Sequence, residues 1–519
     1  MLSVGTAYPL AIGAAAACLG YGFGLGRLLG IAENIGDTGI LGIACIAILG
    51  CAIHFVSALS TTVQIVVIGV GLALCVVFRG ELIRQCRGNL VSILVGLSAF
   101  FHRYAFTIYD NGLYHLQAVK WNSEFPITPG LANLHARLGY NSAIFLMAPL
   151  DDRAEFGWIS GLLLLLFVLM SCYARFSQAR RATTEFWFLG LAVILLALGA
   201  PGELGWVGVL NADGLAAILT IYWFSVALSL PSRPQTGVPL LLLAGALAMT
   251  VKLSAAPLFL MALLVAWYYR KTADVALLKP AAAAAVLLGL WMARGVVLTG
   301  CAVYPLPQTC FSGLPWAVPR RQVAVEMGAI KAWAEAPHQF DPEKVLSDWK
   351  WLGPWCIATW RNWNARLFLA GGMAGCLSVL AGVRLKRMVT AVFLGLCFCL
   401  AYWFLGAPDV RFGYGYLAAA GILGIGMACA AFFPDTDFAR RIPLDAIVLS
   451  VLLGARGLLD SGNTWTIKDR PAIAMRTAPG GKSIWVTQSD REGGDQCWDH
   501  PLPCTPYFSP ENLKRVRWR

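Results

Sequence analysis

Long apolar runs, separated by short basic or long polar segments, occupy most of the chain. A helix of roughly 17–25 apolar residues can cross the hydrocarbon core of a bilayer. The candidate runs are 8–28, 38–55, 57–78, 90–106, 156–173, 186–200, 214–230, 238–251, 253–269, 280–299, 367–383, 388–406, 414–433 and 443–459. The runs 238–251 and 253–269 predict two short helices. Lys252 lies at the turn between them, and Pro257 follows this turn. The pattern predicts an all-α polytopic membrane protein with about 13–14 transmembrane helices.

Basic residues between these runs predict how the chain threads through the membrane, because short cytoplasmic loops are rich in Lys and Arg. The basic clusters all follow odd-numbered candidate helices: Arg79, Arg84 and Arg87; Arg175, Arg180 and Arg181; Arg233; Arg270, Lys271 and Lys279; Arg384, Lys386 and Arg387; Arg440 and Arg441. We therefore expect these gaps to lie inside and the even-numbered gaps outside. The chain then divides into a transmembrane domain, 1–459, and an extracytoplasmic tail, 460–519. Long outer loops cover about 107–155 and 300–366, and a shorter outer segment covers 203–213.

Composition supports a membrane protein and narrows its function. Hydrophobic residues make up 58% of the 519 residues and charged residues 13%, whereas a soluble chain carries about 25% charge. We attribute the net charge of +12 to basic cytoplasmic loops. We do not expect nucleic-acid binding, because the sequence has no basic stripe interleaved with aromatic residues. No Walker loop, dinucleotide fingerprint or His-Glu-x-x-His motif occurs, so we expect no nucleotide-driven pump, no cofactor and no metal site.

The tail contains two cysteines in a polar setting. Most of the 15 cysteines lie inside apolar runs, where they behave as small hydrophobes. Cys497 and Cys504 instead lie in the segment GGDQCWDHPLPCTPYF. Outside the cytoplasm such a pair favours a disulfide, and two free thiols in a loop are the alternative.

The first long outer loop begins with an acid. From Asp110 to Trp121 the pattern suits a short helix, in which Tyr114 stands four residues after Asp110 on the same face and His115 lies one step round. An acid at head-group depth can act as a general base toward a hydroxyl, or it can simply cap a helix. Further candidate substrate contacts in this loop are Lys120, His135 and Arg137.

Charges inside or bordering apolar runs form a second set of candidates. Lys252, Arg294, Asp409 and Arg411 all fall at the predicted outer ends of helices, as Asp110 does. A charge near the bilayer centre costs about 2.5–3.5 kcal/mol, so such residues usually have a role. Three cations beside an acid can bind an anionic head group and stabilise a departing phosphate. The alternative is that they extend to the interface without a partner.

A run rich in tryptophan, DWKWLGPWCIATWRNW, covers roughly 348–363. Tryptophan is enriched at membrane interfaces, so the run predicts an aromatic belt or a helix lying on the membrane. Stacking of a sugar on these rings is the alternative.

Several segments together resemble known membrane proteins. They are YDNGLYHLQAVKW, PGLANLHARLGYNS, VKLSAAP, ARGVVLTGCAVYPLP, APDVRFGYGY and DQCWDHPLPCTPY. They are similar to a bacterial group of poorly characterised membrane proteins, often described as glycosyltransferases. The chain as a whole resembles the GT-C superfamily of membrane glycosyltransferases, which includes aminoarabinose transferases and protein O-mannosyltransferases. The paired acids typical of that superfamily are missing around Asp110, whose neighbours are Tyr109 and Asn111.

This resemblance implies a function. A sugar on a polyprenyl-phosphate donor would pass, with inversion, to a glycan, lipid or protein acceptor on the outer face of the bacterial inner membrane. Asp110 would be the base, and Lys252, Arg294 and Arg411 would contact the donor phosphate. Two other classes stay open: a transporter or flippase of an anionic lipid or glycan, which explains the cations equally well, and a polysaccharide polymerase or ligase, which also has large outer loops. A non-catalytic scaffold is a further alternative.

Overall fold

The computed structural model describes ten segments of the chain. They are 4–31, 34–101, 108–147, 158–199, 210–337, 341–381, 385–433, 441–460, 471–488 and 494–518. Parts of both long outer loops, of the segment 203–213 and of the tail lie outside these segments.

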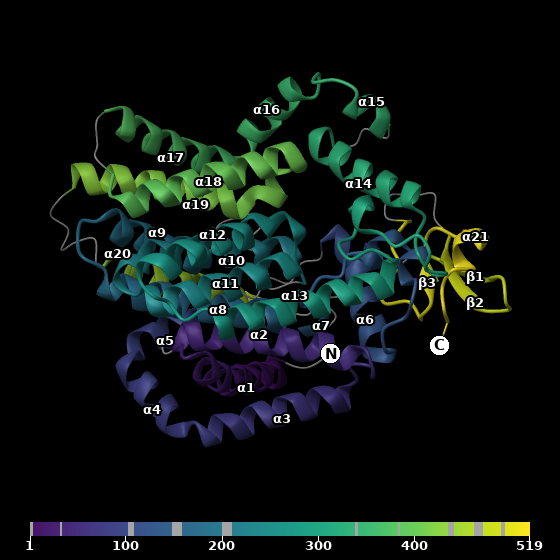
Figure 1. Ribbon diagram of the computed structural model, residues 1–519, viewed down its shortest axis with the longest axis horizontal. Coiled ribbons are helices and arrows are strands. Elements are labelled where there is room, and N and C mark those ends of the chain that lie inside the picture. The colour runs from purple at the N-terminus through teal and green to yellow at the C-terminus, as the bar shows by residue number, and fades with distance from the viewer. Residues whose placement is uncertain are drawn as a thin grey trace.

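The transmembrane domain is a bundle of long helices arranged in three layers (Figure 1). Each predicted apolar run overlaps a helix, which confirms the all-α class. The first layer consists of α1 (Val4–Leu29), α2 (Ile35–His54), α3 (Thr61–Val77), α4 (Arg79–Gly88) and α5 (Leu90–Leu97). The middle layer consists of α8 (Trp158–Gln178), α9 (Thr184–Leu198), α10 (Ala212–Ser229), α11 (Pro234–Val251), α12 (Ala256–Thr272) and α13 (Leu278–Thr299), with α20 (Ile442–Asp460) alongside. The third layer consists of α17 (Trp363–Leu380), α18 (Arg387–Gly406) and α19 (Val410–Phe432).

Fewer helices are long enough to span a membrane than the apolar runs predicted. Within the described residues, 9 helices have the length and composition of a span, or up to 10 if the bent pair α3 and α4 is one span. The chain is therefore a multi-pass membrane protein, and the described residues account for 9 or 10 of the predicted 13–14 spans. Three further predicted runs coincide with shorter apolar helices in the described residues, Leu90–Phe100, Thr184–Leu198 and Ile442–Leu452.

Small residues let neighbouring helices approach closely. A side chain at Gly371 of α17 would lie 2.6 Å from the carbonyl oxygen of Gly421 in α19, so glycine is required at this crossing. Lipid supplies no hydrophobic force between helices, and close backbone packing replaces it. The α17–α19 contact thus joins the third layer into one unit.

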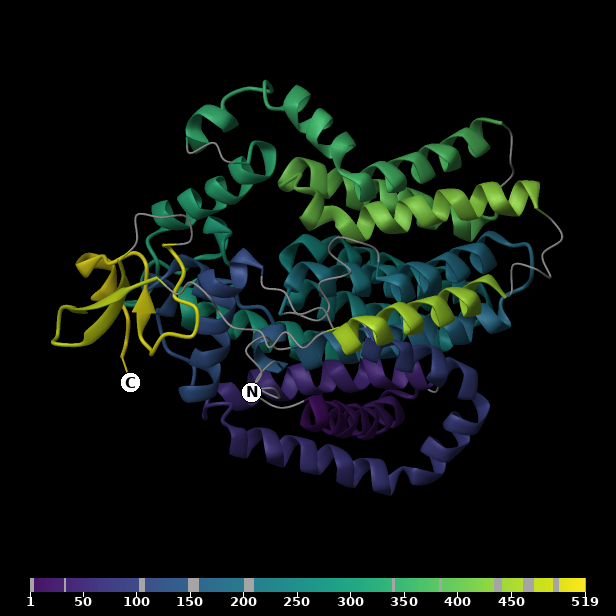
Figure 2. The ribbon, with the colours of Figure 1, turned by 180° about the vertical axis from the view of Figure 1, so that it is seen from behind.

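The outer loops and the tail gather at one end of the bundle (Figures 1 and 2). The first loop forms one π-helical turn, Asn111–His115, followed by α6 (Leu116–Glu124) and α7 (Ile144–Met147). The second loop contains α14 (Arg320–Glu335), α15 (Pro342–Leu346) and α16 (Leu352–Arg361). The side chain of Tyr140 in the first loop bonds to that of Glu326 in the second. The predicted grouping of these loops is therefore observed, while the membrane face they occupy stays a prediction.

The tail folds into a small unit around the predicted disulfide. β1 (Ile473–Thr477) pairs antiparallel with β2 (Ser483–Thr487), which pairs parallel with β3 (Cys504–Thr505), and α21 (Pro510–Leu513) follows. The Cys497–Cys504 bond forms, as the tail sequence favoured. A second disulfide, Cys301–Cys310, closes a turn after α13 and was not predicted.

The tail docks on the first loop at Gly112. The backbone amide of Trp498 donates to the Gly112 carbonyl at 2.9 Å, and a side chain at Gly112 would lie 2.4 Å from the Trp498 ring. We expect Gly112→Ala to displace the ring, destabilise tail docking by about 1–3 kcal/mol and speed proteolytic release of the tail. Gly353→Ala is the matched control, because a side chain there meets nothing within 4 Å. Equal cleavage rates for both variants would contradict the predicted docking contact.

Candidate functional site

Asp110 does not cap a helix in this structure. It adopts helical backbone angles just before the π-helical turn, and its side chain makes no capping hydrogen bond within the described residues. Its carboxylate instead accepts hydrogen bonds from Arg411 at 3.0 Å and from Arg137 at 3.4 Å. Asp110 is buried, with 9% of the residue exposed. The loop therefore presents this acid to one cation of its own, Arg137, and to one from α19, Arg411.

Arg411 joins Asp110 to a second acid. Its Nε lies 3.6 Å from Oδ2 of Asp213, so one guanidinium contacts two carboxylates from different segments. Asp409 positions this arginine, because its side chain caps α19 by accepting from the backbone amide of Arg411 at 2.8 Å. Asp409 was predicted to contact substrate, but its described contacts are those of a cap.

Lys252 completes the cluster from the turn between α11 and α12. Its ammonium forms an ion pair with Asp213 and lies 4.0 Å from the centre of the Phe412 ring. The Tyr416 hydroxyl donates to the carbonyl of Ser254 at 2.7 Å, which ties this turn to α19. The turn predicted at Lys252 is confirmed. We call Arg137, Asp110, Arg411, Asp213 and Lys252 the acid–base cluster.

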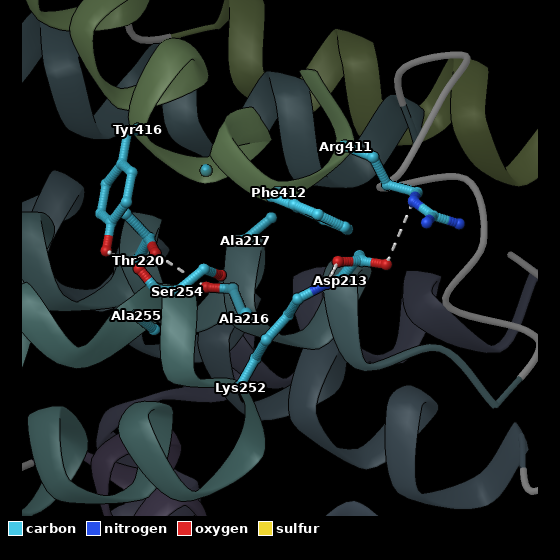
Figure 3. Close-up of a pocket in the computed structure, with 11 residues that line it drawn as sticks. Asp213, Ala216, Ala217, Thr220, Lys252, Ser254, Ala255, Arg411, Phe412 and Tyr416 are labelled. Carbon is cyan, nitrogen blue, oxygen red and sulfur yellow. Dashed lines mark hydrogen bonds and ion pairs between the residues drawn. The ribbon is translucent and has the colours of Figure 1, made fainter. Parts of the chain in front are cut away.

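Figure 3 shows the Lys252 side of this cluster, where a small cavity lies between α10, α19 and the turn after α11. Asp213 reaches between Lys252 and Arg411 in this view. The cavity volume is about 10 Å³, which is roughly the space of one water molecule. The charged groups are thus packed against one another, and a larger ligand requires that they separate.

The surrounding cations keep Asp110 ionised. Burial raises the pKa of its carboxyl, but the opposing effect of Arg411, followed by His115, Arg137 and Lys252, is larger, so the pKa lies below its usual value. His115 is close by and buried, and burial lowers its pKa to about 4. Near neutral pH the imidazole of His115, which lies beside the cluster, is therefore uncharged.

Tyr114 and His115 form the aromatic wall behind Asp110. The two rings meet edge to face with centroids 4.3 Å apart, and Tyr114 also packs edge to face against Tyr140. His115 Nδ1 bonds to the side-chain oxygen of Asn111 at 2.8 Å. Both residues are more than nine-tenths buried, so they form part of the protein packing beside Asp110.

Lys120 and His135 hold the tail and lie apart from the described contacts of the cluster. Lys120 donates to the backbone carbonyls of Asp499 and His500 at 3.2 Å each. The His135 ring packs against Tyr507, and burial lowers its pKa to about 3. The sequence placed both residues among the substrate contacts, whereas the structure places both against the tail, and Lys120 also lies 3.9 Å from Glu124 of α6.

Arg294 also differs from its predicted role. It is 3% exposed, and its guanidinium donates to the side-chain oxygens of Asn141 at 2.5 Å and Asn122 at 2.8 Å, and to His54 at 3.4 Å. These contacts tie α13 to the first loop and to α2. The Arg294 charge is therefore satisfied by protein groups, in place of the donor phosphate contact expected from the sequence.

Asp213 is the functional candidate that sequence reasoning missed. It lies in the first turn of α10, where its backbone amide is capped by the side chain of Asn211 at 2.9 Å. An acid in the first turn of a helix is ordinarily explained by the helix dipole. Its position at an outer helix end, like those of Asp110 and Arg411, was the available signal. Arg411 thus links Asp110 and Asp213, two acids that are far apart in sequence.

The tryptophan run is helical over α16, and its rings pack together. Trp351 lies near Trp349 and Trp355, with centroids 5.5 and 6.1 Å away, and Trp355 also packs on Trp403 of α18. Trp349 is 62% exposed. An interfacial belt and a sugar-stacking surface both stay open for these rings. Among the described residues no group of three or more His, Cys, Asp or Glu side chains is placed to hold a metal ion.

Comparison with known proteins gives one match. A family model described as "Domain of unknown function (DUF8201)" matches residues 10–418, which include the bundle from α1 into α19 and all five residues of the acid–base cluster. No curated protein and no solved structure matches the chain.

Proposed function

Because the chain belongs to the DUF8201 family, a family of unknown function, we propose a function from the site itself: a GT-C-type membrane glycosyltransferase. It would transfer a sugar from a polyprenyl-phosphate donor to an acceptor hydroxyl on the outer face of the bacterial inner membrane. The observation that supports this most is the contact of Arg411 with both Asp110 and Asp213. A carboxylate thus lies next to cations of the kind that bind phosphate groups.

The cluster offers a role for each charge. A carboxylate within reach of a hydroxyl can take its proton, and cations can stabilise a departing phosphate. The acceptor oxygen would attack the anomeric carbon as the bond from that carbon to the phosphate oxygen breaks. The proton passes to Asp110, polyprenyl phosphate leaves toward Arg411 and Lys252, and the configuration inverts.

Donor binding would also activate the base. In the free protein Arg411 contacts Asp110 and so weakens it as a base. A phosphate that draws the guanidinium away removes this effect and raises the affinity of Asp110 for a proton. The paired arrangement thus represents a resting state, which fits the small volume of the cavity.

The test is transfer by purified protein in detergent, where no membrane separates two compartments. We expect release of polyprenyl phosphate and a labelled acceptor when a polyprenyl-phosphate monosaccharide is supplied. A transporter or flippase would bind the donor without cleaving it. Turnover only with a lipid-linked oligosaccharide would indicate a polymerase or ligase. Either outcome would reject the proposed reaction.

The lowered pKa of Asp110 predicts the pH profile. A carboxyl with a depressed pKa is ionised above its usual pKa and is protonated only as the pH falls through the lower value. His115, with a pKa of about 4, is likewise uncharged near neutral pH. We expect kcat/KM, which reports groups of the free enzyme, to show no acid-side loss between about pH 5 and 7. An inflection of kcat/KM near pH 6 that depends on Asp110 would contradict this expected profile.

A further inference from the structure

A large basic cavity lies at the opposite end of the bundle from the acid–base cluster. Its volume is about 800 Å³. The ends of α8, α10 and α19 and the beginnings of α9, α11 and α18 surround it, and these are the helix ends whose connections carry basic clusters. The proposed transfer reaction does not involve this region.

The charge lining the cavity is strongly unbalanced. Its cations are Arg175, Arg180, Arg181, Arg233 and Lys386, and its acid among the described lining residues is Glu185. Arg175 is paired with the buried Asp37, and Glu185 accepts a hydrogen bond from Ser229 at 2.8 Å. Arg180, Arg181, Arg233 and Lys386 are exposed, and the Arg233 guanidinium also donates to the side-chain oxygen of Gln178. The cavity therefore presents a positive surface that attracts an anion.

The cavity is also apolar on one side. Val226 and Leu228 of α10, Val389 of α18 and Met427 of α19 line it together with the cations. These four side chains are themselves buried, and the exposed apolar surface of the cavity comes from its other lining residues Leu385, Met388, Ala430 and Ala431. An inorganic anion uses only the charged part of such a site, whereas a lipid with a phosphate head group uses both parts.

We propose that this cavity binds an anionic phospholipid, with the phosphate against Arg180, Arg181, Arg233 and Lys386 and the first part of the acyl chains against the apolar wall. Basic pockets between helices at the cytoplasmic side of membrane proteins are suited to such head groups. The basic clusters predict this side for the cavity, so the lipid would occupy the inner leaflet, away from the proposed donor. The inference does not depend on the transferase reaction.

The experiment counts lipids on delipidated full-length protein by native mass spectrometry. Phosphatidylglycerol is titrated in one arm, phosphatidylcholine in a second and inorganic phosphate in a third. We expect saturable binding of phosphatidylglycerol at least about tenfold tighter than that of phosphatidylcholine. Phosphate that binds as tightly as phosphatidylglycerol would overturn the lipid proposal, because the apolar wall would then contribute nothing.

Charge removal tests the location of the site. The triple variant Arg180→Gln, Arg181→Gln, Arg233→Gln is expected to weaken phosphatidylglycerol binding by about tenfold or more. The matched control is Arg79→Gln, Arg84→Gln, Arg87→Gln on α4, which removes three exposed cations at other positions. Equal weakening in both variants would reject the cavity as the site. If the first triple variant does not fold, Lys386→Gln alone should still weaken binding, and unchanged affinity would overturn the proposal.

Discussion

Replacing Asp110 by asparagine is expected to lower sugar transfer by about 10²–10⁴-fold, the usual contribution of a positioned general base. The amide has nearly the shape of the carboxylate and can still accept a hydrogen bond from Arg411, but it cannot take a proton. Donor binding should persist, since Arg411 and Lys252 are unchanged. Transfer is measured as release of polyprenyl phosphate, and donor binding as retention of labelled lipid.

The control for this variant is Asp348→Asn. Asp348 lies in the second loop at the same end of the bundle and pairs with Lys350, which is almost fully exposed. This change alters the net charge by the same amount without touching the acid–base cluster. Full transfer activity in a folded Asp110→Asn preparation would exclude Asp110 as the base. Loss of donor binding as well would show that the carboxylate holds the site together.

Replacing Asp37 by alanine should cause the largest loss of stability. Asp37 is fully buried in the first turn of α2 and accepts two hydrogen bonds from Arg175, at 3.0 and 2.9 Å, one from Ser171 at 2.7 Å and one from Tyr222 at 2.9 Å. Its removal leaves the buried Arg175 guanidinium without its carboxylate. The expected cost is about 3–5 kcal/mol, measured by denaturant unfolding in detergent.

A double variant separates the ion pair from the packing around it. Exchanging both charges for apolar groups of similar volume is often neutral, so Asp37→Ala combined with Arg175→Met should recover much of the loss. A double variant as unstable as Asp37→Ala alone would show that the hydrogen bonds to Ser171 and Tyr222 carry the effect. A stable Asp37→Ala single variant would contradict the buried ion pair itself.

The hydrophobic pattern was sufficient to predict the described apolar helices. These are local properties, because each apolar run must satisfy its own backbone hydrogen bonds inside a membrane. The predicted threading placed Asp110, Lys252 and Arg411 at one end, and the structure brings these three together. The Cys497–Cys504 pair was predictable because its partners are near in sequence.

Contacts between distant segments could not be derived in this way. The threading rule shows which end a charge occupies but not which neighbours it meets there. Arg294 and Arg411 were equivalent by that rule, yet Arg294 is enclosed by Asn122 and Asn141 and Arg411 bridges two acids. Asp213 could not be identified as a site residue from the sequence, because the helix dipole already explains an acid at the start of a helix.

The sequence by itself thus determined the class of the protein, the apolar helices and the shared end of the bundle at which Asp110, Lys252 and Arg411 lie, since these follow from the cost of placing polar groups in lipid. Only the tertiary structure decided that Asp213 is the second acid, that Arg294 lies outside the cluster and that the tail covers the first loop. Those outcomes depend on how helices far apart in sequence pack, and packing geometry is not encoded in the periodicity of any single run.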